Sequence, residues 1–528
     1  MKAFAELLDR LAYTPSRNDK LRLLAGYFAA APDPDRGYAL AALTDGLFFR
    51  LPVRRSLSEL LGTRVDPVLF DLSRDYVGDT AETIALIWPG GAKGTKPPRL
   101  AAIVEALQAA PPAEAPALLT GWLDALDATG RWALLKLLTG ALRVGVSGRL
   151  AKTALAEWSG VDLADIEEVW HGLRPPYAEL FAWLSGTGPR PDVSSRATFR
   201  PLMLSHQIED KVLALIEPKD FVAEWKWDGI RVQAAHQAGE KRLFSRTGDD
   251  ISGAFPDVVE AIPGGMVLDG ELLVMREGDV APFNDLQQRL NRKTVTAAML
   301  KSHPAHIRLY DMLFEKGEDL RELPFIERRA RLEAWHAAHG PHRTDISAII
   351  DFSSIGELET LWAGARETGI EGLMLKRRMS PYLAGRPKGH WYKWKRAPLT
   401  IDAVLMYAQR GSGKRSSYYS DYTFGAWRNG ESGVAELVPV GKSYFGFTDE
   451  ELRDLDRWVR NHTVDAFGPV RQVEPKLVFE VAFDSVHRSS RHKSGVAMRF
   501  PRIHRIRWDK PAAEADRLET LTAMIVGS

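Results

Sequence analysis

The stretch Glu224-Trp225-Lys226-Trp227-Asp228-Gly229-Ile230-Arg231 decides how the central part of this chain folds. Residues 221–227 are rich in apolar and aromatic side chains, and Asp228-Gly229 is a turn signal after which the alternation resumes. This pattern predicts two strands joined by a tight turn. Because side chains alternate along a strand, we expect Glu224 and Lys226 to project from one face, so that a carboxylate and an amine enter the same pocket.

An amine in such a pocket is a candidate nucleophile toward phosphorus. An ordinary lysine has a pKa of about 10.4 and is protonated at neutral pH, so lysines act as nucleophiles where burial or nearby cations lower that value. Taken alone, the pattern Lys226-x-Asp228-Gly229 fits an exposed lysine on a half-buried hairpin equally well. Other segments of the chain decide between the two interpretations.

Bulk composition narrows the class of protein. The 528 residues are 45% hydrophobic and 26% charged with a net charge of +1, which predicts a globular protein of about two to four domains. A nucleic-acid surface would therefore have to be a local basic patch. The absence of cysteine excludes disulfides and cysteine-ligated zinc. The first ten residues already carry Glu6, Asp9 and Arg10, so we expect no membrane segment and a cytoplasmic location, associated with the nucleoid in a bacterium.

Residues 1–195 show mostly helical periodicity, which begins with apolar side chains at Phe4, Leu7, Leu8 and Leu11. Two basic, glycine-containing loops interrupt this region, at 89–96 and 143–149. Glycine lets backbone amides approach a phosphate closely, and flanking cations complete such a site. The candidate nucleic-acid contacts are Lys93, Lys96, Arg143 and Arg149. The alternative is a solvated loop and an ordinary helix cap.

From residue 196 to 397 the pattern changes to short strands that carry charged residues. Asp269-Gly270-Glu271 interrupts a hydrophobic strand, where two carboxylates are costly unless they are paired or bound. In residues 391–395, alternation sends Lys393 and Lys395 to one side and the aromatic residues Tyr392 and Trp394 to the other. Two ammonium groups on one face suit a phosphate. Further candidates are Arg246 after a strand, Tyr310 within one, where a core role competes, Glu371 and Arg386.

Residues 398–528 alternate as short strands with one helix at 449–461, which fits an OB-fold barrel, a fold that commonly binds nucleic acid. The loop 409–415 is not a P-loop, because Ala408 and Arg415 stand where that motif needs a glycine and a hydroxyl. A basic hairpin tip is the better interpretation. The candidate nucleic-acid contacts here are Lys414, Arg415, Arg488 and Arg491.

Together these segments resemble the covalent nucleotidyltransferases, which are DNA ligases, RNA ligases and mRNA capping enzymes. Lys226 to Arg231 resembles their K-x-D-G-x-R signature. Six further segments follow in family order, ending in the basic run 499–510. The resemblance covers about residues 199–510 and is greatest to the larger ATP-dependent DNA ligases, since their NAD-dependent counterparts are expected to carry a four-cysteine zinc module. Trp508 departs from the pattern, because ligases often have an acidic residue there.

The resemblance implies a multidomain fold and a set of residue roles. The expected domains are an all-α DNA-binding domain at 1–195, an α+β nucleotidyltransferase domain of ATP-grasp-like type at 196–397 and an all-β OB-fold domain at 398–528. Lys226 is the implied nucleophile and Glu224 accepts a hydrogen bond from the adenine amino group. The other implied roles are ribose or phosphate contacts for Arg231 and Arg246, ribose and metal for Glu271, adenine stacking for Tyr310, metal for Glu371, the α-phosphate for Arg386, Lys393 and Lys395, and pyrophosphate for Arg502, Arg507 and Lys510.

The implied reaction uses ATP and Mg²⁺, with Mn²⁺ as an alternative, and passes through a lysyl-AMP intermediate and a DNA-adenylate. The implied substrate is nicked double-stranded DNA, encircled by a monomer that works in DNA repair, with a repair nuclease or helicase as possible partners. Two rival hypotheses remain: an RNA ligase or capping-type enzyme of the same superfamily, and a non-catalytic DNA end-binding protein.

Overall fold

The computed structural model describes most of the chain as two compact units. The residues it leaves undescribed are 48, 50–56, 58–59, 63, 91–95, 141, 291, 293, 365–369, 396–397, 412–418, 431–432, 445–447, 491 and 526–528. One unit contains residues 1–160, 174–181 and 398–528, and the other contains 161–173 and 182–397.

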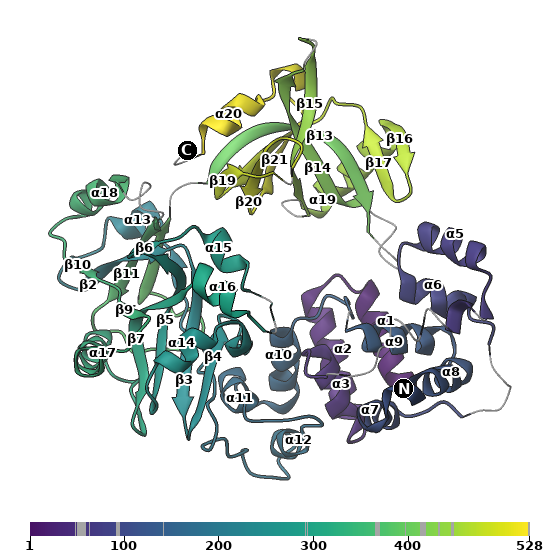
Figure 1. Cartoon of the computed structure of the whole chain (residues 1–528), viewed down its shortest axis with the longest axis horizontal. Coiled ribbons are helices and arrows are strands. Elements are labelled where there is room, and N and C mark those ends of the chain that lie inside the picture. Colours follow the sequence, from purple (N-terminus) through teal and green to yellow (C-terminus); the bar gives the residue numbers. More distant parts are fainter. Residues whose placement is uncertain are drawn as a thin grey trace. The chain divides into compact units, whose positions relative to one another are not determined.

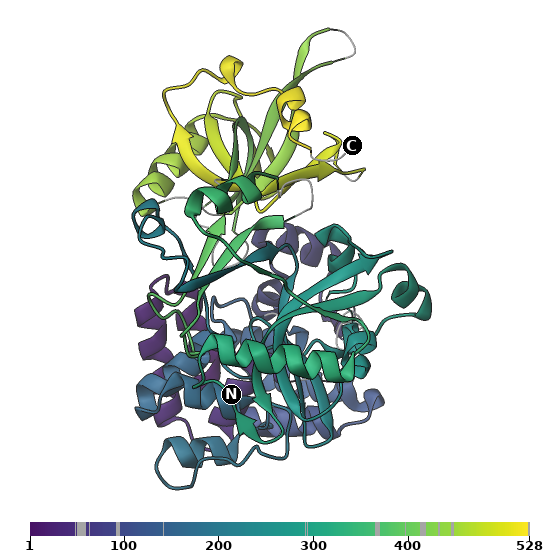
Figure 2. The same ribbon diagram turned by 90° about the vertical axis from the view of Figure 1, so that its left-hand side faces the viewer.

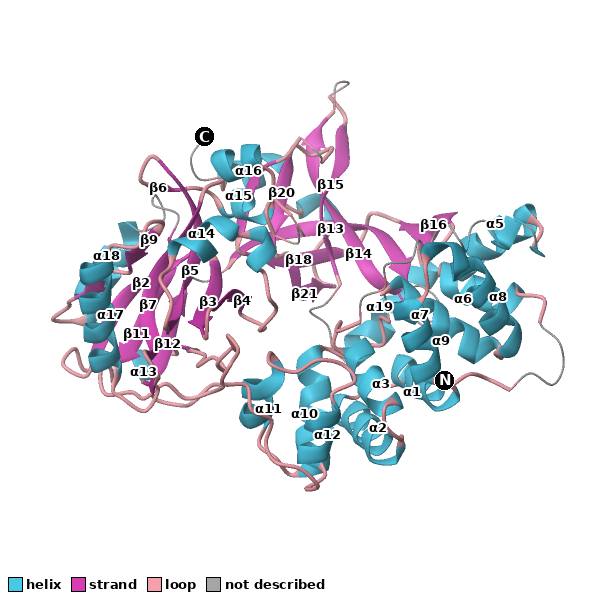
Figure 3. Cartoon of the chain, turned by 60° about the horizontal axis from the view of Figure 1, so that its bottom comes forward, coloured by secondary structure: helices cyan, strands magenta, loops and turns pink. Residues whose placement is uncertain are grey.

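In the described residues up to 160, every regular element is a helix (Figure 3). The first, α1 (Lys2–Tyr13), forms as its periodicity predicts, with its apolar residues Phe4, Leu7, Leu8 and Leu11 all buried. The longer of the others are α2 (Arg17–Ala30), α3 (Asp35–Leu43), α5 (Pro67–Val77), α6 (Thr80–Ile87), α7 (Leu100–Ala109), α8 (Ala115–Ala125), α9 (Ala128–Thr139) and α10 (Gly148–Ser159). Among the described residues, no helix has both the length and the apolar character needed to cross a bilayer.

The helix α11 (Leu163–Trp170) groups with residues 182–397, although sequence periodicity assigned it to the region before residue 195. Three contacts explain this. Glu168 pairs with Arg321 at 2.5 Å, and the His171 ring that follows the helix lies 4.6 Å from the ring of Phe244 and 5.8 Å from that of Phe199. These contacts join residues distant in sequence, which periodicity cannot detect.

The unit that contains residues 182–397 has two main sheets. One has the strand order β1 (His206–Gln207), β12 (Trp391–Lys395), β11 (Ile370–Arg377), β2 (Phe221–Trp227), β10 (Ile349–Ile350). The other has the order β4 (Glu240–Ser245), β3 (Ile230–Gln237), β5 (Met266–Arg276), β7 (Ala305–Glu315), β8 (Glu318–Asp319), with β6 (Asp279–Val280) beside β5 and β9 (Thr344–Ile346) beside β7. Asp228-Gly229 thus joins a strand of one sheet to a strand of the other.

Short helices accompany these sheets: α13 (Asp210–Leu213), α14 (Pro256–Ala261), α15 (Phe283–Gln287), α16 (Ala297–Ser302) and α18 (Ile355–Gly364). The longest described helix of this unit, α17 (Phe325–His339), packs against β7 (Figure 2). Its Leu332 and Trp335 enter the same hydrophobic core as Leu268 and Leu309 of the sheet. This packing fixes the strands from which the charged side chains project.

Figure 1 shows the strands after residue 398. They surround a hydrophobic core that includes Phe424, Phe479 and Phe483. The central strand β13 (Leu399–Arg410) pairs with three others, β14 (Tyr419–Asn429), β17 (Val470–Val473) and β18 (Val478–Phe483). The remaining elements are β15 (Ala435–Ser443), α19 (Asp449–Asn461), β16 (Thr463–Phe467), β19 (Ser485–Arg488), β20 (Val496–Arg499), β21 (Arg502–Arg507) and α20 (Leu518–Ala523). The helix predicted at 449–461 is confirmed, and Thr448 and Glu451 form a capping box at its start.

A fully buried ion pair between α17 and β7 gives a test of this packing. Arg328 and Asp311 have no exposed side-chain surface and form two hydrogen bonds, Nε to Oδ1 at 2.8 Å and Nη2 to Oδ2 at 2.9 Å. Arg328→Met leaves the carboxylate buried without its partner, so we expect the free energy of unfolding to fall by about 3–5 kcal/mol, measured by urea titration. The control Arg331→Met removes a surface ion pair that Arg331 of the same helix forms with Glu318, and it should cost under about 1 kcal/mol. Equal losses would contradict this assignment.

Candidate active site

One face of the first sheet carries charged side chains from three adjacent strands. β11 pairs with β2 on one side and with β12 on the other, so that Gly372 lies opposite both Lys226 and Lys395. Opposed residues share a face of a sheet and side chains alternate along each strand. Lys226 and Lys395 therefore project from the same face as Glu224 and Lys393. The predicted orientation of both motifs is confirmed.

Glu371 links two of these lysines. The register of β11 shifts beside it, and a Cβ at Gly372 would lie 2.1 Å from the carbonyl oxygen of Trp394, so this position accepts only glycine. The Glu371 carboxylate forms an ion pair with Lys226 and another with Lys395 at 3.0 Å. Burial alone would raise the pKa of Glu371, but the two ammonium groups lower it to about 2. Glu371 is therefore a carboxylate at any working pH.

Lys393 differs from Lys226 and Lys395, which both pair with Glu371. Among the described residues, no ion pair or hydrogen bond engages its ammonium group. Its pKa is lowered, first by burial and then by neighbouring cations. Those cations, in decreasing order of effect, are Lys395, Arg386, Arg246 and Lys226. Five side chains predicted to contact ATP thus share one electrostatic environment, which favours the binding of a polyphosphate.

Glu271 lies beneath the turn that follows Lys226. In the second sheet it is opposite Arg231 on one side and Arg308 on the other. A Cβ at Gly229 would lie 2.7 Å from Cγ of Glu271 and 2.5 Å from the carbonyl oxygen of Leu272. The glycine of the Lys226 motif is therefore required because the turn packs directly on Glu271.

The electrostatics of Glu271 suit a group that binds a cation. Burial raises its pKa to about 7, Lys226 and Arg231 oppose that shift, and the charge of Glu371 adds to it. Two carboxylates that influence each other in this way are stabilised in their charged forms by a cation placed near both. Among the described residues, no three His, Asp or Glu side chains converge to hold a metal ion by themselves.

Arg231 is engaged within the protein. Its guanidinium forms two hydrogen bonds with the buried Asp269, at 2.7 and 3.1 Å. It also donates to the carbonyl oxygen of Met203 at 2.7 Å and to the Tyr382 hydroxyl at 3.0 Å. Tyr382 in turn donates to Asp269 at 2.6 Å. The expected contact of Arg231 with ribose or phosphate stays a prediction, and the observed contacts connect this arginine to β5 and to the segments around Met203 and Tyr382.

Sequence reasoning missed the groups that surround Glu224. Its carboxylate is 2% exposed and pairs with Lys376 at 3.0 Å and Arg329 at 3.6 Å. The Lys376 ammonium also lies 4.3–4.9 Å from the centres of three aromatic rings, those of Tyr310, Phe325 and Trp391. Strand alternation could have identified Lys376. Counting along β11 in steps of two from Gly372 places Lys376 on the face of the sheet that also carries Glu224. No pattern in the sequence indicated that Arg329 contacts Glu224.

The candidate pyrophosphate contacts lie in the other compact unit, with residues 398–528. Each is paired with a carboxylate of that unit. Arg502 pairs with Asp484 at 3.1 Å, whereas Lys510 and Arg507 pair with Asp402 at 2.7 and 3.3 Å. A role in orienting pyrophosphate would require these cations to exchange their partners.

The candidate DNA contacts divide into two groups. Lys96, Arg143, Arg149 and Arg488 are exposed. Lys93, Lys414, Arg415 and Arg491 lie outside the described residues. The expected basic hairpin tip at 409–415 is therefore described only as far as residue 411.

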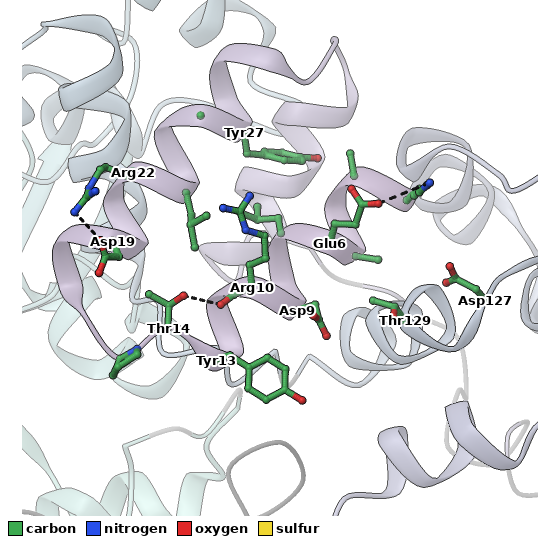
Figure 4. A pocket seen from close by; sticks show the side chains of 17 residues that line it. Glu6, Asp9, Arg10, Tyr13, Thr14, Asp19, Arg22, Tyr27, Asp127 and Thr129 are labelled. Carbon is green, nitrogen blue, oxygen red and sulfur yellow. Dashed lines mark hydrogen bonds and ion pairs between the residues drawn. The ribbon is translucent and has the colours of Figure 1, made fainter.

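A cavity of about 1270 Å³ lies among α1, α2 and the start of α9 (Figure 4). Its walls carry both signs of charge, and an ion pair between Arg22 and Asp19 at 2.6 Å lies at its edge. None of the candidate catalytic or ATP-binding residues lines it. The chemistry that the motifs predict therefore belongs to the sheet face around Lys226 and not to this cavity.

Comparison with known proteins agrees with that chemistry. Residues 202–395 match the ATP dependent DNA ligase domain, and residues 415–510 match the ATP dependent DNA ligase C terminal region. The chain is 37% identical over 412 residues to a probable DNA ligase of Koribacter versatilis, which covers 73% of this chain and 70% of that protein. It is 33% identical over 540 residues to a probable DNA ligase of Beutenbergia cavernae, which covers 98% of both.

A solved structure named "Pmar-Lig_Pre." aligns with 96% of this chain and 99% of its own, at a TM-score of 0.57 and 17% identity, which indicates a similar fold. The two matched regions cover more than half of the sequence, and relatives align along nearly all of it. The chain belongs to the family of ATP-dependent DNA ligases.

Proposed function

We propose that this ligase seals nicks through a covalent intermediate on Lys226. The amine attacks the α-phosphorus of ATP, an N–P bond forms, pyrophosphate leaves and the amine loses a proton. The AMP group then passes to the 5′-phosphate of a nick, which releases the lysine. Finally the 3′-hydroxyl attacks that phosphate, AMP leaves and the strand is closed. The cluster of cations around Lys226, above all Lys393 with no described carboxylate partner, is the observation that carries this proposal.

The same cluster supports roles in the chemistry. In phosphoryl transfer, charge spreads over the non-bridging oxygens, and preorganised cations stabilise it. Lys393 and Lys395 would hold the α-phosphate, with Arg246 and Arg386 at its rim. Tyr310, whose ring packs on the Lys376 ammonium, would contact the adenine. Glu224, fixed by Lys376, would accept the hydrogen bond from the adenine amino group.

The residues present fit a divalent cation. Magnesium is usually bound through one or two carboxylates together with substrate phosphates, and it keeps several waters. Glu271 and Glu371 would supply those carboxylates, and their mutual repulsion favours such a cation. When bound, the cation supplies charge stabilisation at the phosphate oxygens. If Glu371 paired with the divalent cation, its ion pair with the Lys226 ammonium would weaken.

We further propose that residues 1–195 and 398–528 act as a DNA-binding domain and an OB-fold domain on either side of the catalytic region in sequence. The exposed arginines Arg143, Arg149 and Arg488 support a role of both regions in binding DNA. The enzyme would work as a monomer around nicked duplex DNA in repair.

Incubation with ATP labelled at the α-phosphate tests the proposal. The protein should acquire a covalent label that is chased onto the 5′-phosphate of a nicked DNA duplex and released as AMP on sealing. A label that transfers only to nicked RNA would favour the RNA ligase, and no label at all would favour a non-catalytic protein.

Base selection gives a second prediction. Glu224→Gln removes the charge that anchors Lys376 and weakens the acceptor for the adenine amino group. We expect the rate of label formation per unit of ATP concentration to fall about tenfold or more, and the preference for ATP over GTP to fall with it. Single-turnover labelling with both nucleotides measures this. Glu217→Gln, an exposed control on the preceding turn, should change neither value. An unaltered preference in Glu224→Gln would contradict the assigned role.

A further inference from the structure

The loop between α9 and α10 holds one of the proposed DNA contacts in an unusual backbone conformation. Arg143 has a φ of +48° and Gly145 a φ of +68°. The left-handed region is natural for glycine but is sparsely populated by arginine, so neighbouring contacts must maintain it. Both residues are exposed, whereas Val144 between them is 2% exposed.

The contact that maintains this loop comes from a buried lysine on another helix. Lys20 of α2 is only 6% exposed, and its ammonium donates to the carbonyl oxygens of Val144 at 2.8 Å and Gly145 at 2.9 Å. α2 packs against α10, the helix that follows the loop. A buried ammonium group is costly without such acceptors, and hydrogen bonds from a charged donor are stronger than those from a neutral one.

These two bonds also fix the direction of the backbone donors. In a trans peptide the N–H points away from the C=O. With the carbonyl groups of Val144 and Gly145 turned toward Lys20, the N–H groups of Gly145 and Val146 point away from it. Among the described residues, neither of these N–H groups donates to a protein acceptor. Backbone N–H groups beside an exposed arginine are typical contacts of a DNA phosphate.

We propose that Lys20 is a positioning residue for DNA binding. It holds the loop 143–146 so that the Arg143 side chain and two backbone N–H groups face a phosphate of the duplex, and it does not touch the DNA itself. The proposal rests on the proposed function of this loop as a DNA contact. The proposed role of Lys20 does not involve the nucleotide site, which lies in the other compact unit.

Nick binding and self-adenylation separate this role from a general effect on folding. In the full chain, Lys20→Met should weaken the binding of a nicked duplex by about tenfold or more, measured by fluorescence anisotropy, while the rate of label formation from ATP alone changes less than about twofold. Lys20→Arg, which keeps a charged donor, should restore most of the affinity. Lys20→Gln, which keeps an uncharged amide donor, should fall between them and serves if Lys20→Met does not fold.

A double-mutant cycle distinguishes the two ways in which the inference would fail. If Lys20 acts through the loop, Lys20→Met combined with Arg143→Ala should bind little more weakly than the worse single variant. Wild-type affinity in Arg143→Ala would refute the DNA-binding role of the loop. Two outcomes would refute the role of Lys20 alone. In the first, Arg143→Ala binds the nicked duplex more weakly while Lys20→Met and Lys20→Gln bind it normally. In the second, the losses of affinity in the two single variants simply multiply in the double variant.

Discussion

Lys226→Ala is expected to abolish the covalent labelling of the protein by ATP that carries a labelled α-phosphate. The amine is the only group of the motif that can form the N–P bond, so the rate should fall by more than about a thousandfold, to the limit of detection. The measurement is radioactivity that remains with the denatured chain. Lys219→Ala, an exposed lysine just before β2, should label like the wild type.

A pre-adenylated nick separates the loss of the nucleophile from a loss of fold. In that substrate the AMP is already on the 5′-phosphate, so sealing needs the cations and the metal but no lysyl-AMP. Lys226→Ala should therefore still close a pre-adenylated nick, although more slowly because its ammonium no longer adds to the positive cluster. Undiminished labelling in Lys226→Ala would place the nucleophile elsewhere and overturn the assignment.

Alternation and turn signals predicted the catalytic face well. They placed Glu224 with Lys226 on one face of their strand and Lys393 with Lys395 on one face of theirs, and the strand register brings the two pairs to the same face of the sheet. This succeeded because the rule is local: side chains two positions apart share a face in any sheet. The helix at 449–461 was also predicted to the residue, since its cap and its amphipathic pattern are local signals.

The groups that hold this face in place were not predictable in the same way. Arg329 reaches Glu224 from α17, and Tyr382 joins Arg231 and Asp269 from a segment more than a hundred residues away. Such contacts depend on how the sheets and helices pack, and neither periodicity nor spacing encodes that. The same limit explains α11, whose amphipathic pattern identified a helix but not the unit on which it packs.

Glu371→Gln should be the most damaging change that leaves the nucleophile in place. Without its carboxylate, the ammonium groups of Lys226, Lys393 and Lys395 face one another unscreened, and one of the two proposed metal ligands is lost. We expect single-turnover labelling to slow by about a hundredfold or more and to need more magnesium.

The pH profile supplies an independent readout of the same change. Because its folded-state pKa is about 2, Glu371 contributes stability that is present above the unfolded value of about 4.5 and is lost only as the pH falls toward 2. In the wild type, acid unfolding should therefore steepen below about pH 4.5, and Glu371→Gln should flatten that part of the profile. The matched control is Glu359→Gln, which changes an exposed residue of α18. It should leave the labelling rate and the unfolding profile below about pH 4.5 unchanged. If Glu371→Gln labels within about threefold of the wild type, the carboxylate neither orients Lys226 nor binds the metal, and its ion pairs serve the fold alone.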